Sequence, residues 1–322
     1  MSHTESIQLP AGVSIHPVAG RIGAEIRGVK LSADLPADVR DAIRAAWLKY
    51  KVVFFRGQTH LDDASQETLV GLFGDKAVQH PTAHTKEGTS YVLELDSHRG
   101  GRANSWHTDV TFVDAYPQAS ILRGVTIPEA GGDTVWANTH AAYNDLAPEL
   151  RELAEKLWAV HSNEYDYAAR KPNADQEALK RYQEVFTSTV YETEHPVVHV
   201  HPETGERHLL LGHFVKRIVG LSTSDSQHLF NLLQSHVTKL ENTVRWRWQE
   251  GDVAVWDNRA TQHYAVDDYG DAHRVVRRVT VDGTVPVAVD GRRSQTRSKV
   301  ARNPAASSAA NESSARTETA VA

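Results

Sequence analysis

The chain has 322 residues, no cysteine, 18 histidines and a formal net charge of −6 at neutral pH. Without cysteine it cannot form disulfides, thiolate zinc sites or iron–sulfur clusters, so a metal would have to be held by imidazole and carboxylate groups. The mild acidity argues against a nucleic-acid partner. No signal sequence and no apolar stretch of roughly 20 residues is visible, so we expect a cytoplasmic protein that does not cross a membrane.

Apolar residues at helical spacing predict three amphipathic helices, and a capping signal predicts a fourth. Ser222 is expected to cap this last helix, because Asp225 then lies in its first turn, where the helix dipole favours an acid. The helices are expected over residues 37–50, 62–73 and 142–157 and from Ser222 to about residue 240.

Short strands are predicted between and after these helices. The segment KVVFFRGQ (51–58) indicates a buried strand, and further strands are expected over 243–249, 252–256 and 274–281. Many short strands without regular strand–helix alternation favour a mainly β fold with flanking helices and a jelly-roll core, formed by residues 1–291 as one domain. The remaining segment, 292–322, has no aromatic residue and is expected to be a disordered C-terminal tail.

The segment WHTDVTF (106–112) holds a possible metal-binding pair. Its β-branched and aromatic residues favour an extended chain, in which His107 and Asp109 point to the same face. His263, in the segment WDNRATQHYA, is the candidate for a third ligand. Two histidines and one carboxylate form the facial triad of non-haem Fe(II) oxygenases, which leaves open positions for a co-substrate and O2.

Two arginines after His263 point to anion binding. In a strand over 274–281, Arg274 and Arg278 share a face, about 13 Å apart at ~3.3 Å per residue, while Arg277 points the other way. The planar guanidinium grips a carboxylate or sulfate with two hydrogen bonds, and an inward arginine is costly unless an anion neutralises it. Each of the two can therefore hold a different anion.

Together, WHTDVTF, GGDTVWAN (131–138) and WDNRATQHYAVDDYGDAHRVVRR (256–278) make the chain resemble the taurine/2-oxoglutarate dioxygenase family. GRIGAEIRGV (20–29) and FFRGQ (54–58) match the opening strands of that family, and the resemblance spans residues 12 to 290. It implies a double-stranded β-helix core and a homo-oligomer, either a dimer or a tetramer. It also implies Fe(II) bound by His107, Asp109 and His263, with 2-oxoglutarate as co-substrate held by Thr134 and Arg274, and O2 as oxidant.

The resemblance places His80 and Arg278 at the anionic group of the substrate. The chain departs from taurine-specific members after His80, where it reads PTAHT without the expected tyrosine, and before the metal motif, where SHRGGRANS lacks the acidic, asparagine-rich run. These segments are most similar to the alkyl-sulfate-cleaving branch of the family. Val110 would then line a channel for the alkyl chain.

The expected reaction is hydroxylation of the carbon that bears the sulfate ester, which releases an aldehyde and sulfate together with succinate and CO2. Two alternatives stay open. The first is a dioxygenase for taurine or another alkyl sulfonate, which would release sulfite. The second is a jelly-roll protein without redox activity that binds Zn²⁺ or Ni²⁺, because affinity alone does not select iron. Arg274 follows His263 by eleven residues, as the resemblance requires of the 2-oxoglutarate anchor. A metal site without redox activity needs no such anchor, which argues against this second alternative.

Overall fold

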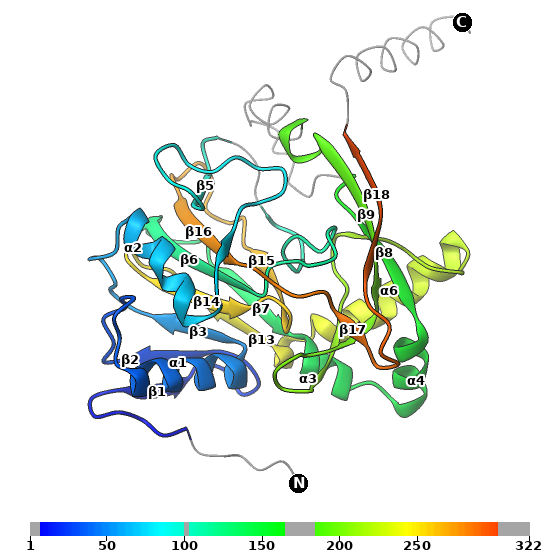
Figure 1. Ribbon diagram of the computed structural model, residues 1–322, viewed down its shortest axis with the longest axis horizontal. Helices are drawn as coiled ribbons and strands as arrows, with labels where there is room; N and C mark the ends of the chain where they lie inside the picture. Colours follow the sequence, from blue (N-terminus) through cyan, green and yellow to red (C-terminus); the bar gives the residue numbers. More distant parts are fainter. Residues whose placement is uncertain (1–6, 100–102, 165–183, 302–322) are drawn as a thin grey trace, which may run out of the picture.

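The computed structural model describes residues 7–99, 103–164 and 184–301, which form a mainly β structure with flanking helices (Figure 1). Its largest sheet contains the strands β1 (Ser14–Pro17), β2 (Ala24–Arg27), β3 (Val52–Phe55), β4 (Ala77–Val78), β5 (Leu93–Asp96), β6 (Ala119–Thr126), β14 (Val253–Asp257) and β16 (Val275–Val281). The strand order is β1-β2-β3-β14-β6-β16-β4, and β5 pairs with β16. The strands predicted over 51–58, 252–256 and 274–281 are thus confirmed as β3, β14 and β16.

A second sheet packs against this one through aromatic side chains. It has the order β13-β7-β15, with β7 at Thr134–Asn138, β13 at Thr243–Trp246 and β15 at Thr261–Ala265. Phe54 of β3 stacks on Trp246 of β13 with ring centroids 4.1 Å apart, and Trp136 of β7 lies 5.7 Å from Trp256 of β14. Stacked and tilted aromatic pairs of this kind stabilise a core beyond the area that they bury.

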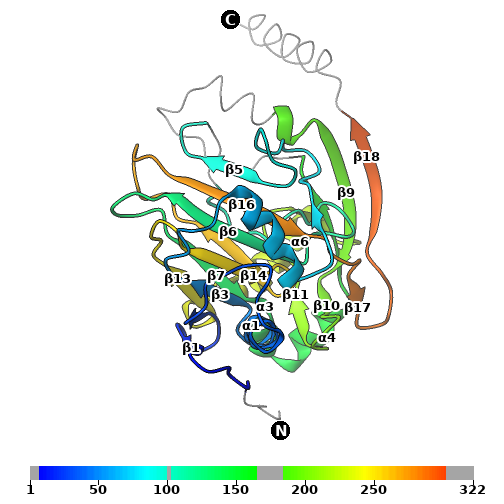
Figure 2. The same cartoon turned by 60° about the vertical axis from the view of Figure 1, so that its left-hand side comes forward.

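Two smaller sheets complete the part of the chain that the structure describes. One has the order β12-β8-β9-β18 and the other the order β11-β10-β17. Figure 2 shows β18 beside β9. Their strands are β8 (Trp158–Ser162), β9 (Thr189–Pro196), β10 (Val198–Val200), β11 (Arg207–Leu209), β12 (Val215–Ile218), β17 (Val287–Ala288) and β18 (Gln295–Ala301).

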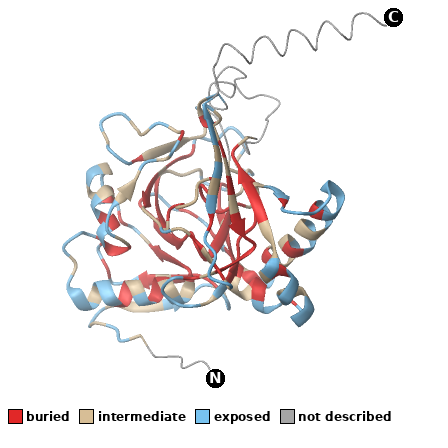
Figure 3. Cartoon of the chain, turned by 45° about the vertical axis from the view of Figure 1, so that its right-hand side comes forward, coloured by how far each residue is buried: buried red, intermediate tan, exposed pale blue. Residues whose placement is uncertain are grey.

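The helices pack on the outside of the sheets and bury one side each (Figure 3). The predicted helix over 37–50 is confirmed as α1 (Ala37–Tyr50), whose Trp47 packs on β3 and β14. Ser222 caps α6 as predicted, because its side chain accepts the backbone N–H of Asp225. Within the described residues, the helices with given bounds are α1, α2 (Asp63–Thr68), α3 (Thr139–Asn144), α4 (Pro148–Lys156) and α6 (Thr223–Val237), with 3-10 turns at Leu69–Leu72 and Leu240–Asn242. No helix within the described ranges is long and apolar enough to span a membrane.

Two predicted segments differ in the structure. The helix expected over 142–157 is divided into α3 and α4, because Pro148 starts a new helix and disfavours helical backbone at the residue before it. The disordered tail expected from 292 is wrong for residues 295–301, which form β18 and pair along β9. This strand alternates side chains between two faces and draws its stability from backbone hydrogen bonds, which composition does not reveal. Residues 302–322 lie outside the described residues.

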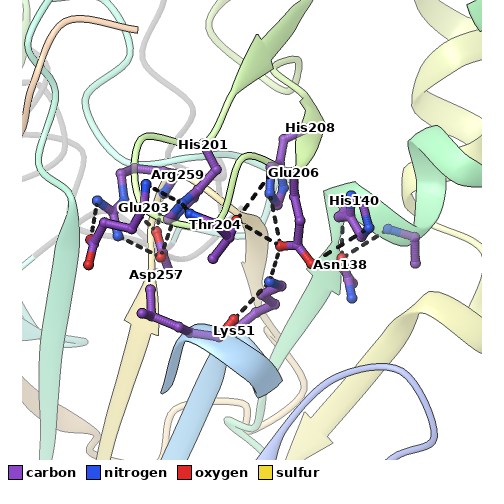
Figure 4. A network of polar contacts seen from close by, with 12 residues as sticks. Lys51, Asn138, His140, His201, Glu203, Thr204, Glu206, His208, Asp257 and Arg259 are labelled. Carbon is purple, nitrogen blue, oxygen red and sulfur yellow. Dashed lines mark hydrogen bonds and ion pairs between the residues drawn. The ribbon is translucent and has the colours of Figure 1, made fainter. Parts of the chain in front are cut away.

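A polar network lies where β14 ends and the chain returns from β10 to β11 (Figure 4). Buried Asp257 accepts two hydrogen bonds from the Arg259 guanidinium, at 2.9 and 2.8 Å, and one from His201 at 2.9 Å. Beside it, the ammonium of Lys51 pairs with the carboxylate of Glu206. Buried charges are tolerated when they are paired and hydrogen-bonded in this way. The network fixes the turn that leads from β14 into β15.

Candidate active site

The two histidines of the predicted triad are joined by their backbones. His263 lies in β15, and its backbone exchanges hydrogen bonds with His107 in both directions, at 2.8 and 3.1 Å. His107 is therefore an isolated bridge partner of β15. The extended strand expected over 106–112 is not formed, because a turn begins at Asp109. The imidazole rings of the two histidines lie 4.1 Å apart, centroid to centroid.

Asp109 is aimed at these rings by the turn and by Asn258. The Asn258 side chain accepts the backbone N–H of Asp109 at 2.9 Å and donates to its carbonyl at 3.0 Å. The next residue, Val110, has a φ of +62°. Left-handed backbone is rare for a β-branched residue, and such strained positions cluster at functional sites. The hydroxyl of Ser120 donates to Asp109 Oδ2 at 2.9 Å and fixes the carboxylate.

The donor atoms of the three side chains suit a metal ion. The Nε2 atoms of His107 and His263 each lie 3.8 Å from the same oxygen, Asp109 Oδ1. Metal–nitrogen and metal–oxygen bonds of roughly 2.1 Å can bridge such gaps. His107 Nδ1 lies 2.7 Å from the Ser105 carbonyl, to which it donates, so the neutral ring presents the lone pair of Nε2 toward Asp109.

The electrostatics keep these ligands in the protonation states that a metal needs. Burial lowers the pKa of both His107 and His263, so both rings are neutral near pH 7. Burial by itself would raise the pKa of Asp109, but the charge of Arg278 and the nearby imidazoles override it and hold that pKa well below its usual range. Arg278 pairs directly with Asp109 Oδ1. A deprotonated carboxylate and two neutral imidazoles therefore face one another.

A cavity of about 110 Å³ adjoins the triad, and five other predicted site residues lie around it or close by. Arg274 and Arg278 both line it, while Arg277 points away and pairs with Asp63 and Glu94. The period-two prediction for the three arginines is thus confirmed. The cavity is also lined by His80, Thr134, His107 and His263.

Arg274 is held by a glycine turn on the far side of the cavity. Its Nε donates to the Gly132 carbonyl at 3.0 Å, and the Gly132 N–H donates to Asp268 at 2.8 Å. Gly132 has a φ of +70°, and a Cβ on it would lie 2.8 Å from the Arg274 side chain, so only glycine fits. Arg245 ties this turn down by pairing with both Asp133 and Asp268.

Thr134 is buried near Arg274, and its hydroxyl already has one partner. The indole N–H of Trp248 donates to Thr134 Oγ1 at 3.0 Å. A hydroxyl carries a single proton, so Thr134 Oγ1 accepts from the indole and still has its own O–H to donate to another group. Trp248 therefore directs Thr134 toward a role as a donor at the cavity wall.

His80 also lines the cavity, with its ring orientation set by the following turn. His80 Nδ1 accepts the backbone N–H groups of Thr82 and Ala83, at 3.2 and 2.9 Å. The proton of the neutral ring is therefore on Nε2, which makes that atom a donor. Burial and the neighbouring charge of Arg278 lower the pKa of His80 to about 3. The ring is thus a neutral hydrogen-bond donor beside a cationic guanidinium.

The role of Val110 in lining an alkyl channel stays a prediction. Val110 is buried in an apolar cluster next to the triad and is not among the residues that line the cavity. The reason is its left-handed backbone, which ends the expected strand and turns the side chain into the interior. The other members of this cluster are Phe112, Phe186, Tyr191 and Phe214, and the rings of Phe112 and Phe186 also contact His80.

Sequence reasoning missed the residues that position the ligands. Asn258, Ser120 and Trp248 each bond to a candidate site residue, and Asp268 accepts a hydrogen bond from Gly132, whose carbonyl holds Arg274. No short-range pattern marks Ser120, Trp248 or Asp268. Asn258 alone carried a signal, since a buried Asp-Asn pair just before a metal motif is typical of a turn that is fixed by its side chains. The structure buries His161, His195, His199, His201 and His208.

Comparison with known proteins defines the class. Residues 14–280 match the sequence profile of the "Taurine catabolism dioxygenase TauD, TfdA family". The chain therefore belongs to this family, which the sequence motifs had indicated.

Individual relatives narrow the similarity. The chain is 68% identical over 287 residues to a protein of Pseudomonas putida named alpha-ketoglutarate-dependent sulfate ester dioxygenase, with 89% of this chain and 95% of the relative covered. It is 60% identical over 294 residues to an alkylsulfatase of Acinetobacter baylyi, with 91% and 92% covered. A crystal structure of a taurine dioxygenase from Burkholderia xenovorans matches with a TM-score of 0.74 and 39% identity, covering 91% of this chain and 96% of that chain.

Proposed function

We propose that this protein is an Fe(II)- and 2-oxoglutarate-dependent dioxygenase that cleaves alkyl sulfates. It would hydroxylate the carbon bearing the sulfate ester and release an aldehyde and sulfate, with 2-oxoglutarate converted to succinate and CO2. The observation that carries the proposal is one cavity in which the triad meets two inward arginines, each placed to neutralise an anion. The names of the relatives at 68% and 60% identity support the same substrate class.

In this proposal His107, Asp109 and His263 hold the iron. When bound, Fe(II) would supply the reductive activation of O2 that organic side chains cannot perform. The chain's own part is to keep both imidazoles neutral and the carboxylate charged, as the pKa directions indicate. The clamp formed by Asn258 and Ser120 keeps Asp109 oriented toward both rings, which limits the cost of reorganisation.

The co-substrate would bind at the Arg274 end of the cavity. Arg274 is fixed through its Nε by Gly132, so the outer edge of the guanidinium can grip a carboxylate with two hydrogen bonds. The O–H of Thr134 would donate to the same carboxylate, because Trp248 already supplies the proton that this hydroxyl accepts. The proposal thus assigns a dicarboxylate to Arg274 and leaves Arg278 for the substrate.

The sulfate group would bind between Arg278 and His80. Arg278 brings a charge, and the neutral His80 ring brings an N–H donor at Nε2. Because Arg278 contacts Asp109, an anion held there lies next to the triad, which places the adjoining carbon close to the reaction centre. The Phe112 and Phe186 rings against His80 give this end an apolar side that suits an alkyl chain.

We further infer that the two sheets packed through Trp136 and Trp256 are the core of a double-stranded β-helix, within one domain that covers nearly the whole described chain. The match of the family profile to residues 14–280 supports this. A homo-oligomer and a cytoplasmic location stay predictions from the sequence.

Anaerobic titration tests the proposal. Fe(II) and 2-oxoglutarate together should give the visible charge-transfer band of their chelate, and Arg274→Ala should require a higher 2-oxoglutarate concentration for the same band. A protein that binds iron without the band would be the non-redox metal-binding protein instead. In the same samples, an alkyl sulfate should bind more tightly than taurine, and the reverse order would favour the sulfonate dioxygenase.

A further inference from the structure

A second group of side chains of the metal-ligand type lies beside the active-site cavity, which Asp96 lines. Asp96 ends β5, His98 follows in the next turn, and His273 precedes β16. The strands bring them together, because Asp96 is paired with Val275 across the sheet. One candidate ligand atom from each of the three side chains lies within 4.8 Å of the other two.

The geometry of this group is already set by its own contacts. His273 Nε2 lies 3.0 Å from Asp96 Oδ1, and the backbone N–H of His98 donates to the same oxygen at 3.0 Å. The two imidazole rings are stacked, with centroids 4.2 Å apart and planes inclined by 13°. Both rings therefore lie beside one carboxylate, and small side-chain rotations would turn a nitrogen of each toward a shared ion.

The charge at the group favours a cation. Burial would raise the pKa of Asp96, but its hydrogen bonds with His98 and His273 lower it, so Asp96 is ionised near neutral pH. The competing cation is Arg99, which lies 3.5 Å from the other carboxylate oxygen, Oδ2, and whose side chain is 79% exposed. An exposed arginine at that distance holds the carboxylate only weakly.

The molecule provides an internal contrast in His140, Glu206 and His208, which also bring their ligand atoms together. There the Lys51 ammonium contacts the carboxylate from the interior, with the Lys51 side chain only 4% exposed (Figure 4). Displacing it would leave a buried positive charge unpaired, which is costly. Lys51 thus already acts as the cation at Glu206, whereas the arginine or lysine that pairs with Asp96 among the described residues is the exposed Arg99.

We propose that Asp96, His98 and His273 form a second metal site, which takes a divalent ion of the Zn²⁺ class and is separate from the triad. Two imidazoles and one carboxylate with an open side suit Zn²⁺, Ni²⁺ or Cu²⁺ better than Mg²⁺ or Ca²⁺. Asp96 also lines the cavity, and the backbones of Ser97 and Arg274 are joined by a hydrogen bond of 2.9 Å. An ion at this rim site would lie beside the cavity, next to the backbone of Arg274, which precedes β16.

Equilibrium dialysis with Zn²⁺ at pH 7.5 tests the rim site. The wild-type protein should bind about two ions per chain, one of them at the triad. His98→Ala and His273→Ala should each remove one ion or weaken its binding at least tenfold, since each removes one of three ligands. His208→Ala is the matched control, which also removes a candidate histidine ligand and should leave both ions bound.

A further variant separates the two sites. The double substitution His107→Ala/His263→Ala should still bind about one Zn²⁺, and adding His273→Ala to it should abolish that binding. Circular dichroism checks that each variant folds. If the triad variant does not fold, the comparison of Zn²⁺ bound per chain between the wild-type protein and His273→Ala tests the proposal by itself. A wild-type protein that binds a single ion, or rim substitutions that change nothing, would overturn the proposal. Loss of the second ion in His208→Ala would place it at Glu206 instead.

Discussion

The triad and the Glu206 cluster, meaning His140, Glu206, His208 and Lys51, combine the same kinds of side chain for different ends. Both set two imidazoles around one carboxylate that also pairs with a cation. At Glu206 the cation is Lys51, whose side chain is only 4% exposed and also donates to the Leu48 carbonyl. At Asp109 it is Arg278, which lines a cavity large enough to admit an anion.

This difference teaches that the ligand set alone does not define a metal site. In the triad, Nδ1 of the neutral His107 is fixed by the Ser105 carbonyl, and Asp109 is held in place by Asn258. The triad also adjoins a cavity. In the Glu206 cluster, a buried lysine already pairs with the carboxylate. Substitutions in the two places should therefore separate catalysis from stability.

Substitution of the triad should have the largest effect on activity. Replacing His107, Asp109 or His263 by Ala should lower turnover by roughly 1000-fold or more, because the reaction then lacks its metal. His208→Asn, in the Glu206 cluster, should keep activity within a few-fold of wild type. Succinate formation measures both, and near-normal turnover in a folded triad variant would contradict the assignment.

The two arginines should separate the two anions. Arg274→Ala should raise the KM for 2-oxoglutarate by about 10- to 100-fold, and Arg278→Ala should raise the KM for the alkyl sulfate by a similar factor, as expected for the loss of a charge-assisted hydrogen bond. Arg277→Ala is the control, since this side chain faces Asp63 and Glu94 on the other side of the strand. Steady-state kinetics, with 2-oxoglutarate and the alkyl sulfate varied in turn, measure both KM values. If the two KM effects were exchanged, the roles of Arg274 and Arg278 would be reversed.

Glu206→Gln should lower stability and spare catalysis. The substitution leaves the Lys51 charge buried without its carboxylate, so the free energy of unfolding should fall by about 2 kcal/mol. Denaturant unfolding measures the loss, and kcat/KM under native conditions should stay near the wild-type value. If Glu206→Gln lost activity as a triad variant does while it stayed folded, the contrast between the two regions would fail.

Acid should destabilise the Glu206 cluster through His208. Burial lowers the pKa of His208 to about 4 in the folded chain, against about 6.5 when unfolded. As pH falls below 6.5, the unfolded chain takes up the proton first. The part of the free energy of unfolding that depends on a neutral His208 is therefore fully present above pH 6.5 and is lost toward pH 4. The Tm should therefore be lower at pH 5 than at pH 7, by a smaller amount in His208→Asn. An equal pH effect in both proteins would exclude His208 as a source.

The chemistry-bearing residues could be predicted from the sequence because their spacing is local. Arg274 and Arg278 lie four residues apart, and strand periodicity places them on one face, where both line the cavity. His107 and Asp109 lie only two residues apart, but a turn at Asp109 brings them together and not the strand that was expected. Local sequence signals also predicted α1, its neighbour β3 and the cap of α6, because these signals lie within the elements themselves.

The residues that position the site could not be predicted, because they act across long sequence separations. Asn258 reaches Asp109 over 149 residues, and Trp248 reaches Thr134 over 114. The left-handed turn at Val110 contradicts its own β propensity, so local preference gave the wrong conformation there. The strand β18 exists through its register with β9, which a polar composition conceals.

The most direct test is to measure the products formed from a medium-chain alkyl sulfate by the iron-loaded enzyme. Our account predicts succinate and inorganic sulfate in equal amounts, dependent on 2-oxoglutarate and O2, with much slower turnover of taurine. Sulfite released from taurine as the faster reaction, or sulfate released without succinate, would contradict it.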